Sequence, residues 1–210
     1  MSTIRDKGSE TDGVGRRAAS QRGAESRANP ALSLRLRQWR AQRGWTLVAL
    51  AQVSGVSRAM ISRIERGEAS PTAGVIERLA TAFGLSMSQL LSANPANPPA
   101  AGLLRAGAQP FWQDPATGYR RRQVATAPDW PGDVTAIELP PGRQVLFPAA
   151  AFAFRLHLII VLQGVLDLTE GALRHRLGPG DRLILGEPRD CRYANPGPEP
   201  VEYLVLVMPG

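Results

Sequence analysis

The most constraining feature of this chain is the segment over residues 46–67, TLVALAQVSGVSRAMISRIERG, which predicts two short helices joined by a turn. Thr46 is a good helix N-cap, and Leu47 and Leu50 follow on one face at helical spacing. Gly55 can adopt the left-handed conformation that ends a helix. The segment therefore predicts a helix, a tight turn and a second helix.

The second helix of this pair carries basic and small side chains on its outer face. Ser57 is placed to cap it, while Ile61 and Ile64 point inward and Gly67 ends it. A surface helix with solvated arginines would show the same pattern when taken alone. In a helix-turn-helix DNA reader, however, this helix enters the major groove. We predict that the DNA contacts come from Thr46, Ser57, Arg58, Ala59, Ser62, Arg63 and Arg66.

The flanking segments favour the DNA-binding interpretation. Further helices are predicted over residues 33–42, 72–83 and 86–91. The segments LAQVSGVS, ISRIERG, SPT, LATAFG and SMSQLL follow one another in the order typical of the Cro/C1 phage-repressor type of DNA-binding domain. Residues 34–91 resemble that family, and the resemblance implies a five-helix fold.

The same resemblance implies an ion pair and shows one departure. In that family an arginine of the first helix pairs with a glutamate late in the recognition helix, and Arg40 and Glu65 occupy those positions. The family often has a phosphate-binding glutamine directly after the first N-cap, where this chain has Leu47. Backbone N–H groups at that helix start can still bind a phosphate.

Charge and cysteine content restrict the function further. Residues 1–92 hold 14 Lys+Arg against 7 Asp+Glu, whereas residues 93–210 hold 11 of each, so the net charge of +7 lies in the first part. A cationic domain gains affinity for a polyanion by releasing counterions. A single cysteine, short apolar runs and no apolar core in residues 1–30 predict a cytoplasmic protein without a membrane span or signal peptide.

The composition divides the chain into four parts. Residues 1–30 are rich in Gly, Ser, Arg and Ala and are predicted to be a disordered tail. Residues 31–92 form the predicted helix-turn-helix domain. Residues 93–102, ANPANPPAAG, are a predicted linker. Residues 103–210 show period-two alternation with Gly/Pro turns, which predicts an all-β, two-sheet jelly roll.

The second half resembles a cupin. The residues that carry the resemblance are Pro141-Gly142, VLQG at 161–164, RLGPGD at 176–181 and Asn195-Pro196-Gly197. The whole chain then resembles bacterial regulators in which a Cro/C1-type reader precedes a C-terminal cupin sensor. We therefore expect a multidomain protein, α then β, with a five-helix DNA-binding domain followed by a cupin-like β-barrel.

The metal positions that the cupin resemblance implies are largely lost. The two-histidine position falls near FPAAAF, residues 147–152, which offers no ligand. His157 stands at the glutamate position and Cys191 at the last histidine position. Since a stable site needs three or four protein ligands, we expect no metal and no cofactor. Water or an effector could complete a weak site at this pair, or both residues could simply pack in the barrel.

His157 and Cys191 are nevertheless our candidates for the wall of an effector pocket. A redox role for Cys191 is a further alternative, because Arg189 and Arg192 flank it and could lower its pKa if their side chains point toward the thiol.

Three functions fit these observations. The first is a sequence-specific transcription regulator that binds double-stranded operator DNA as a homodimer, with a barrel that dimerises and responds to a small molecule. The second is a metal-dependent cupin enzyme fused to a DNA-binding domain, which the missing ligands disfavour. The third is a DNA-binding interaction protein of the antitoxin type. We expect a regulator and not an enzyme.

Overall fold

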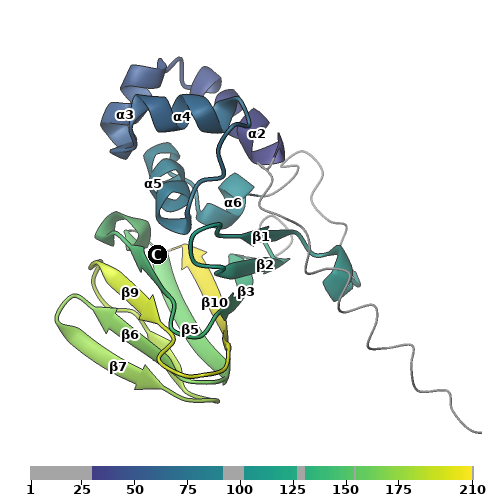
Figure 1. Ribbon diagram of the computed structural model, residues 1–210, viewed down its shortest axis with the longest axis vertical. Coiled ribbons are helices and arrows are strands. Elements are labelled where there is room, and N and C mark those ends of the chain that lie inside the picture. Colours follow the sequence, from purple (N-terminus) through teal and green to yellow (C-terminus); the bar gives the residue numbers. More distant parts are fainter. Residues whose placement is uncertain (1–29, 92–101, 127–130, 154, 210) are drawn as a thin grey trace, which may run out of the picture.

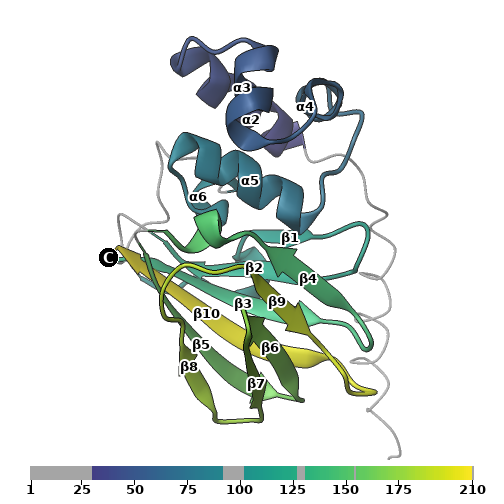
Figure 2. The same ribbon diagram turned by 90° about the vertical axis from the view of Figure 1, so that its left-hand side faces the viewer.

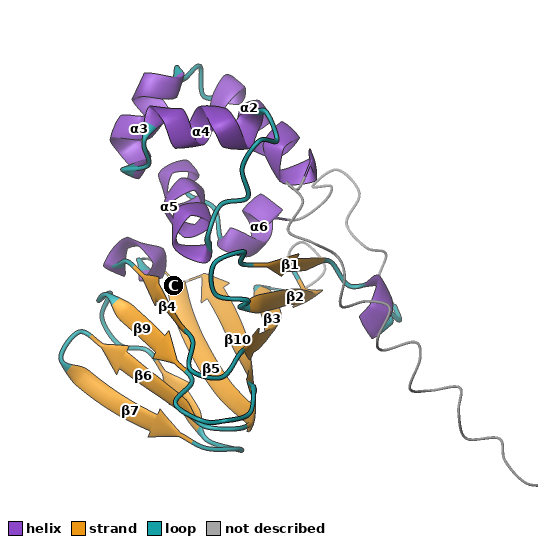
Figure 3. Cartoon of the chain, viewed as in Figure 1, coloured by secondary structure: helices purple, strands orange, loops and turns teal. Residues whose placement is uncertain are grey.

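The computed structural model describes residues 30–91, 102–126, 131–153 and 155–209. Figures 1 and 3 show a group of helices at one end of an antiparallel β domain. This arrangement confirms the predicted order of a helical region followed by a two-sheet β domain. The predicted tail and linker lie outside the described residues, except for Gly102 and for Pro30, which the structure places in the first described helix.

The helical region contains five described helices. They are α2 (Pro30–Gln42), α3 (Leu47–Ser54), α4 (Arg58–Glu65), α5 (Ala73–Phe83) and α6 (Met87–Leu91). In the part of the chain that the structure describes, none of the helices is long and apolar enough to cross a membrane.

The predicted caps fix the ends of the helix pair. The Thr46 hydroxyl accepts the N–H of Ala49 at 3.1 Å, and the Ser57 hydroxyl accepts that of Met60 at 3.2 Å. Gly55 ends α3 with φ 66°, as a left-handed C-cap. The sequence therefore determines the start of both helices and the turn between them locally.

An ion pair and stacked rings hold the helices together. Arg40 of α2 donates two hydrogen bonds to the Glu65 carboxylate at the end of α4, at 2.7 and 2.9 Å, as the resemblance implied. Trp45 stacks on Phe83 with ring centroids 5.6 Å apart. Around these contacts lies a core of fully buried aliphatic side chains, which includes Leu36, Leu50, Ile61, Ile64, Ile76 and Leu79.

The β domain consists of two antiparallel sheets. The larger sheet has the order β1-β2-β3-β10-β5-β8, and the smaller has the order β4-β9-β6-β7. Their strands are β1 (Phe111–Gln113), β2 (Arg120–Ala125), β3 (Asp133–Leu139), β4 (Gln144–Phe147), β5 (Arg155–Gln163), β6 (Leu166–Glu170), β7 (Leu173–Leu177), β8 (Arg182–Ile184), β9 (Cys191–Ala194) and β10 (Val201–Pro209). Tyr203 of the larger sheet stacks on Tyr193 of the smaller one, with ring centroids 6.0 Å apart.

The helical region docks on one end of the β domain through α5 and α6, as Figure 2 shows. Thr72, the N-cap of α5, makes no side-chain cap hydrogen bond. Asp114, from the turn between β1 and β2, accepts the N–H of Ala73 at 2.7 Å instead. At the other end of α5, Arg155 of β5 donates to the carbonyl of Gly84 at 3.2 Å.

Both ends of α5 are therefore capped by side chains of the β domain. The carboxylate lies at the positive end of the helix dipole and the guanidinium at its negative end, so both contacts are electrostatically favourable. Ser86 adds a hydrogen bond to the buried Asp133 of β3. The helical region and the barrel thus share a polar, partly buried interface.

We predict that Glu65→Gln destabilises the helical region by about 1–2 kcal/mol, because it removes a charge-assisted partner from the half-buried Arg40. Chemical denaturation of the full chain measures this loss. The matched control is Glu68→Gln, which breaks the exposed Arg66–Glu68 pair and is expected to change stability little. Equal effects of the two substitutions would contradict a structural role for Arg40–Glu65.

Candidate DNA-binding face and interdomain cavity

The recognition helix α4 packs against α2 and α3, while α5 and α6 make the contacts to the β domain. Arg58, Ala59 and Arg63 on α4 are exposed, and Ser62 is half-buried beside them. The structure therefore brings the predicted base-reading residues together on one accessible face. The exposed hydroxyls of Thr46 and Ser57, already accepting from their own helices, can still donate their hydrogens to a phosphate.

Arg66 differs from the other predicted DNA contacts. Its guanidinium binds the Glu68 carboxylate at 2.6 and 2.7 Å and also donates to the Ser62 hydroxyl. A phosphate would have to compete with Glu68 for this arginine. Arg58 and Arg63 are therefore better placed than Arg66 to contact DNA directly.

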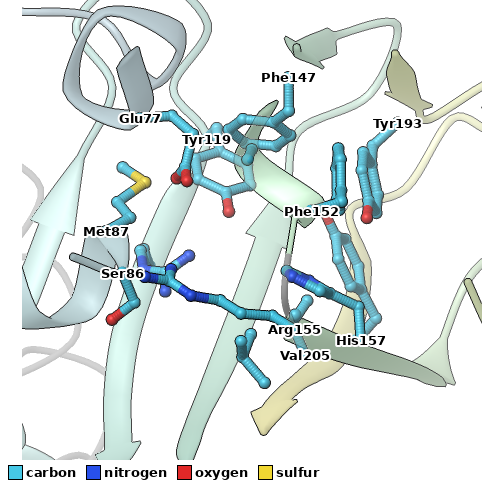
Figure 4. Close-up of a pocket in the computed structure, with 14 residues that line it drawn as sticks. Glu77, Ser86, Met87, Tyr119, Phe147, Phe152, Arg155, His157, Tyr193 and Val205 are labelled. Atoms are coloured by element: carbon cyan, nitrogen blue, oxygen red, sulfur yellow. The ribbon is translucent and has the colours of Figure 1, made fainter. Parts of the chain in front are cut away.

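A second candidate site is a cavity of about 50 Å³ between the helical region and the β domain (Figure 4). Three of its residues belong to the α5–α6 segment: Glu77, Ser86 and Met87. The remaining lining residues come from the β domain and are Tyr119, Arg121, Phe147, Ala151, Phe152, Arg155, His157, Tyr193, Tyr203, Val205 and Val207. Anything bound in this cavity would contact both parts of the protein.

His157 is a buried polar residue in this cavity. Only 8% of it is exposed, and its Nε2 atom is buried without a hydrogen-bond partner. Its ring packs against that of Phe152, with centroids 4.9 Å apart. Burial lowers the pKa of His157 to about 4, helped by the positive charges of Arg155 and Arg121, so the imidazole is neutral at pH 7.

Glu77 brings a carboxyl group from α5 into the same cavity. Burial raises the pKa of Glu77 to about 7, although the nearby guanidinium groups of Arg121 and Arg155 oppose this shift. Arg121 also bridges the two parts of the protein, because it donates to the hydroxyl of Ser88 in α6 and to that of Thr135 in β3. Its Nε atom is buried without a hydrogen-bond partner.

Cys191 does not share this cavity with His157. It lies on β9 in the smaller sheet and borders a separate groove between α5 and the strands β4 and β6. Its thiol donates to the carbonyl of Arg189 at 3.4 Å. Burial, together with Glu170 and Asp190, raises the pKa of Cys191 to about 12. The hypothesis that flanking arginines lower this pKa is therefore wrong, and the thiol is a poor candidate for a redox switch.

Side chains that could form a metal site were compared within the part of the chain that the structure describes. Within it, no group of three or more His, Cys, Asp or Glu side chains could hold an ion. The segment read as the lost two-histidine position forms the 3₁₀ helix Ala149–Phe152, and its Ala151 and Phe152 contribute apolar wall to the cavity. The absence of a bound metal stays a prediction.

Sequence reasoning missed the charged residues of the cavity. Glu77 stands between Ile76 and Leu79 on the inward side of α5, and a charged residue within an apolar face could have drawn attention. Arg121 lies in an arginine run on a strand, where its direction depends on the register of β2 against β3. Neither pattern alone indicates that the two residues meet.

Comparisons with known proteins agree with this geometry. A helix-turn-helix family model matches residues 36–90. The HTH-type transcriptional regulator SutR of Escherichia coli is 46% identical over 61 residues, which are 29% of this chain and 34% of that regulator. The HTH-type transcriptional regulator DdrOP3 of Deinococcus deserti is 30% identical over 129 residues, covering 61% of this chain and 95% of DdrOP3.

This chain belongs to the XRE-type helix-turn-helix family of transcriptional regulators. A solved structure, an HTH_3 family transcriptional regulator from Vibrio cholerae, superposes with a TM-score of 0.71 at 24% identity. The match covers 86% of this chain and 96% of that protein, so the fold is shared across both parts. The protein is thus a DNA-binding XRE-type regulator whose helix-turn-helix region is followed by a two-sheet β domain.

The first prediction for this XRE-type regulator concerns base reading. Arg63→Ala should lose operator binding by about 1–3 kcal/mol while most affinity for unrelated duplex DNA remains, because a bidentate arginine–guanine contact discriminates between bases. Fluorescence anisotropy with both duplexes measures the ratio of the affinity for the operator to the affinity for unrelated DNA. Arg66→Ala is the matched comparison and should alter that ratio less, since Glu68 already binds Arg66. Equal losses on both duplexes for Arg63→Ala would show a phosphate contact only.

The second prediction concerns Glu77 and pH. Because the folded-state pKa of about 7 exceeds the ordinary value of 4.5, the folded protein holds this proton more tightly than the unfolded chain does. The contribution of Glu77 to stability is therefore most favourable below pH 4.5 and is lost as the pH rises to 7. Relative to wild type, Glu77→Gln should gain about 2–3 kcal/mol of stability between pH 5 and pH 8. The free energy of unfolding of both proteins is measured by denaturation at each pH. A difference between wild type and Glu77→Gln that stays constant from pH 5 to pH 8 would contradict a buried carboxyl group with a raised pKa.

Proposed function

We propose that this XRE-type regulator binds a specific operator as a homodimer, and that a small molecule in the interdomain cavity changes its affinity for DNA. The observation that carries the proposal is the composition of the cavity wall. Glu77 and Met87 come from the DNA-binding side, and His157 and Tyr203 come from the barrel. An occupant that fits one arrangement of the two parts better than another shifts the equilibrium between them, and with it the position of the recognition helix.

The outer face of the larger sheet supports dimer formation. Along β5 the outward residues from Leu156 to Leu162 are all apolar, and they alternate with the inward residues of the strand. Neighbouring strands continue the outward rows, since Leu158 is paired with Ile184 of β8 and with Leu206 of β10. In a monomer this outward-facing row would be exposed to water, yet it is apolar across three strands. An exposed apolar row of this kind is typical of an interface with a second copy of the chain.

DNA recognition also favours a dimer. One recognition helix reads too few base pairs to be selective in a genome. Two helices related by a two-fold axis read half-sites about 34 Å apart, or a multiple of that spacing.

A regulatory rather than catalytic role is supported by the chemistry of the cavity. Metal-cupin catalysis needs three or four well-held ligands, and the cavity offers His157 and one carboxyl group, Glu77. The large remaining part of the wall is aromatic or aliphatic, which suits a small organic ligand.

The proposed effect of a small molecule on DNA affinity is tested with the dialysable fraction of a bacterial lysate as the probe. An operator is first selected from a randomised duplex library, and its affinity is then measured with and without this fraction. We expect a change of about tenfold for the wild type, in the usual range of allosteric coupling. Val205→Phe, which fills the cavity, should lose the response and keep operator binding. An operator affinity that no fraction alters would contradict the proposal.

We predict that Leu158→Glu separates the dimer, because it places a charge in the middle of the apolar row. Sedimentation velocity should show a dimer for the wild type and a monomer for the variant, whose operator affinity should fall at least about tenfold. Leu173→Glu is the control, since Leu173 is an exposed leucine on β7 of the other sheet. A wild type that is monomeric at operator-binding concentrations would contradict the dimer.

A further inference from the structure

The charges around the interdomain cavity do not balance. The charged and titratable groups that face it are Glu77 from α5, Arg121 from β2, Arg155 and His157 from β5, and the tyrosines Tyr119, Tyr193 and Tyr203. Two guanidinium groups thus face a single carboxyl group, while the imidazole is neutral. A buried space with excess positive charge gains from an anion that compensates it.

Two buried nitrogen atoms in the cavity wall are also unsatisfied. The Nε atom of Arg121 and the Nε2 atom of His157 have no hydrogen-bond partner. His157 is more than nine-tenths buried, and Figure 4 shows its ring beside the space that Arg155 enters. Since native proteins leave few buried polar atoms unpaired, both atoms indicate a missing partner in this space.

The rest of the wall restricts the size and shape of that partner. Phe147, Phe152 and Val205 add apolar surface to the wall that the charged groups line. The volume of about 50 Å³ has room for about four water molecules, or for an organic molecule of about four to six non-hydrogen atoms. The partner therefore needs one anionic end and one short apolar end.

We propose that the interdomain cavity binds a short-chain aliphatic monocarboxylate, with the carboxylate held by Arg121 and Arg155 and the alkyl chain against Phe152 and Val205. The proposal rests on the proposed function, because it names the ligand class of the same cavity. A guanidinium is well suited to hold a carboxylate, with paired N–H groups that match its two oxygens.

Glu77 gives this ligand a route to the DNA-binding helices. The ligand and Glu77 are both carboxylates that face the same two guanidinium groups, so they compete. Arg155 also donates to the carbonyl of Gly84 at the end of α5. A carboxylate that draws Arg155 into the cavity weakens the attachment of α5, and α5 packs directly against α3 of the helix pair.

Calorimetric titration of the full chain with sodium butyrate at pH 8, where Glu77 is ionised, tests the site. We expect one butyrate per chain and no binding of butanamide or butylammonium, which match its shape without its charge. Arg155→Gln should weaken butyrate binding at least about tenfold, whereas Glu77→Gln should tighten it, because the competing charge is removed. Arg182→Gln, an exposed arginine on β8, is the control and should leave binding unchanged.

Several results would overturn the ligand class. Butanamide that binds as tightly as butyrate would show that the negative charge of the ligand does not matter. Inorganic phosphate that binds as tightly as butyrate would show that the apolar wall does not matter. Val205→Phe keeps every charged group and should abolish butyrate binding. A Val205→Phe protein that binds butyrate like the wild type would place the ligand elsewhere.

Operator affinity measured in the same samples separates this inference from the proposed function. Butyrate that binds without changing operator affinity would support the site and contradict the regulatory role. A lysate fraction that changes operator affinity through the cavity, with no carboxylate of the series binding, would support the regulatory role and overturn the ligand class.

Discussion

The arrangement of this protein depends on the attachment of α5 to the barrel. This helix has no side-chain cap of its own at either end, since Thr72 makes no cap hydrogen bond and Gly84 has no side chain. Asp114 binds the N–H of Ala73 at one end, and Arg155 binds the carbonyl of Gly84 at the other. Both contacts complement the helix dipole. The cavity exists because the helix held in this way closes the end of the barrel.

The local part of the fold could be predicted from the sequence. Thr46 and Ser57 cap their helices through their own side chains, and the alternation of apolar residues predicted the β domain. Both features depend on residues that are neighbours in the sequence. The docking of α5 could not be predicted in this way. Asp114 precedes Pro115 in the turn between β1 and β2, where one of its oxygens accepts the N–H groups of Ala116 and Thr117. Its second oxygen binds a helix 41 positions away, which no local pattern indicates.

The candidate sites show the same division. The exposure of Arg58, Ala59 and Arg63 on one face of α4 follows from helical spacing, whereas the ion pair between Glu68 and Arg66 does not. His157 was found through the cupin resemblance and does line the cavity. Cys191 came from the same comparison but lies on the other sheet. Glu77 and Arg121, which line the same cavity as His157, could be recognised only once the packed interface was known.

The central claim is that the DNA-binding helices and the barrel form one cooperative unit joined through α5. Differential scanning calorimetry of the full chain tests it most directly. The account predicts a single transition whose calorimetric and van't Hoff enthalpies agree, and which separates into two when Asp114→Ala removes the cap that the barrel supplies. Two independent transitions in the wild-type protein, unaffected by Asp114→Ala, would contradict it.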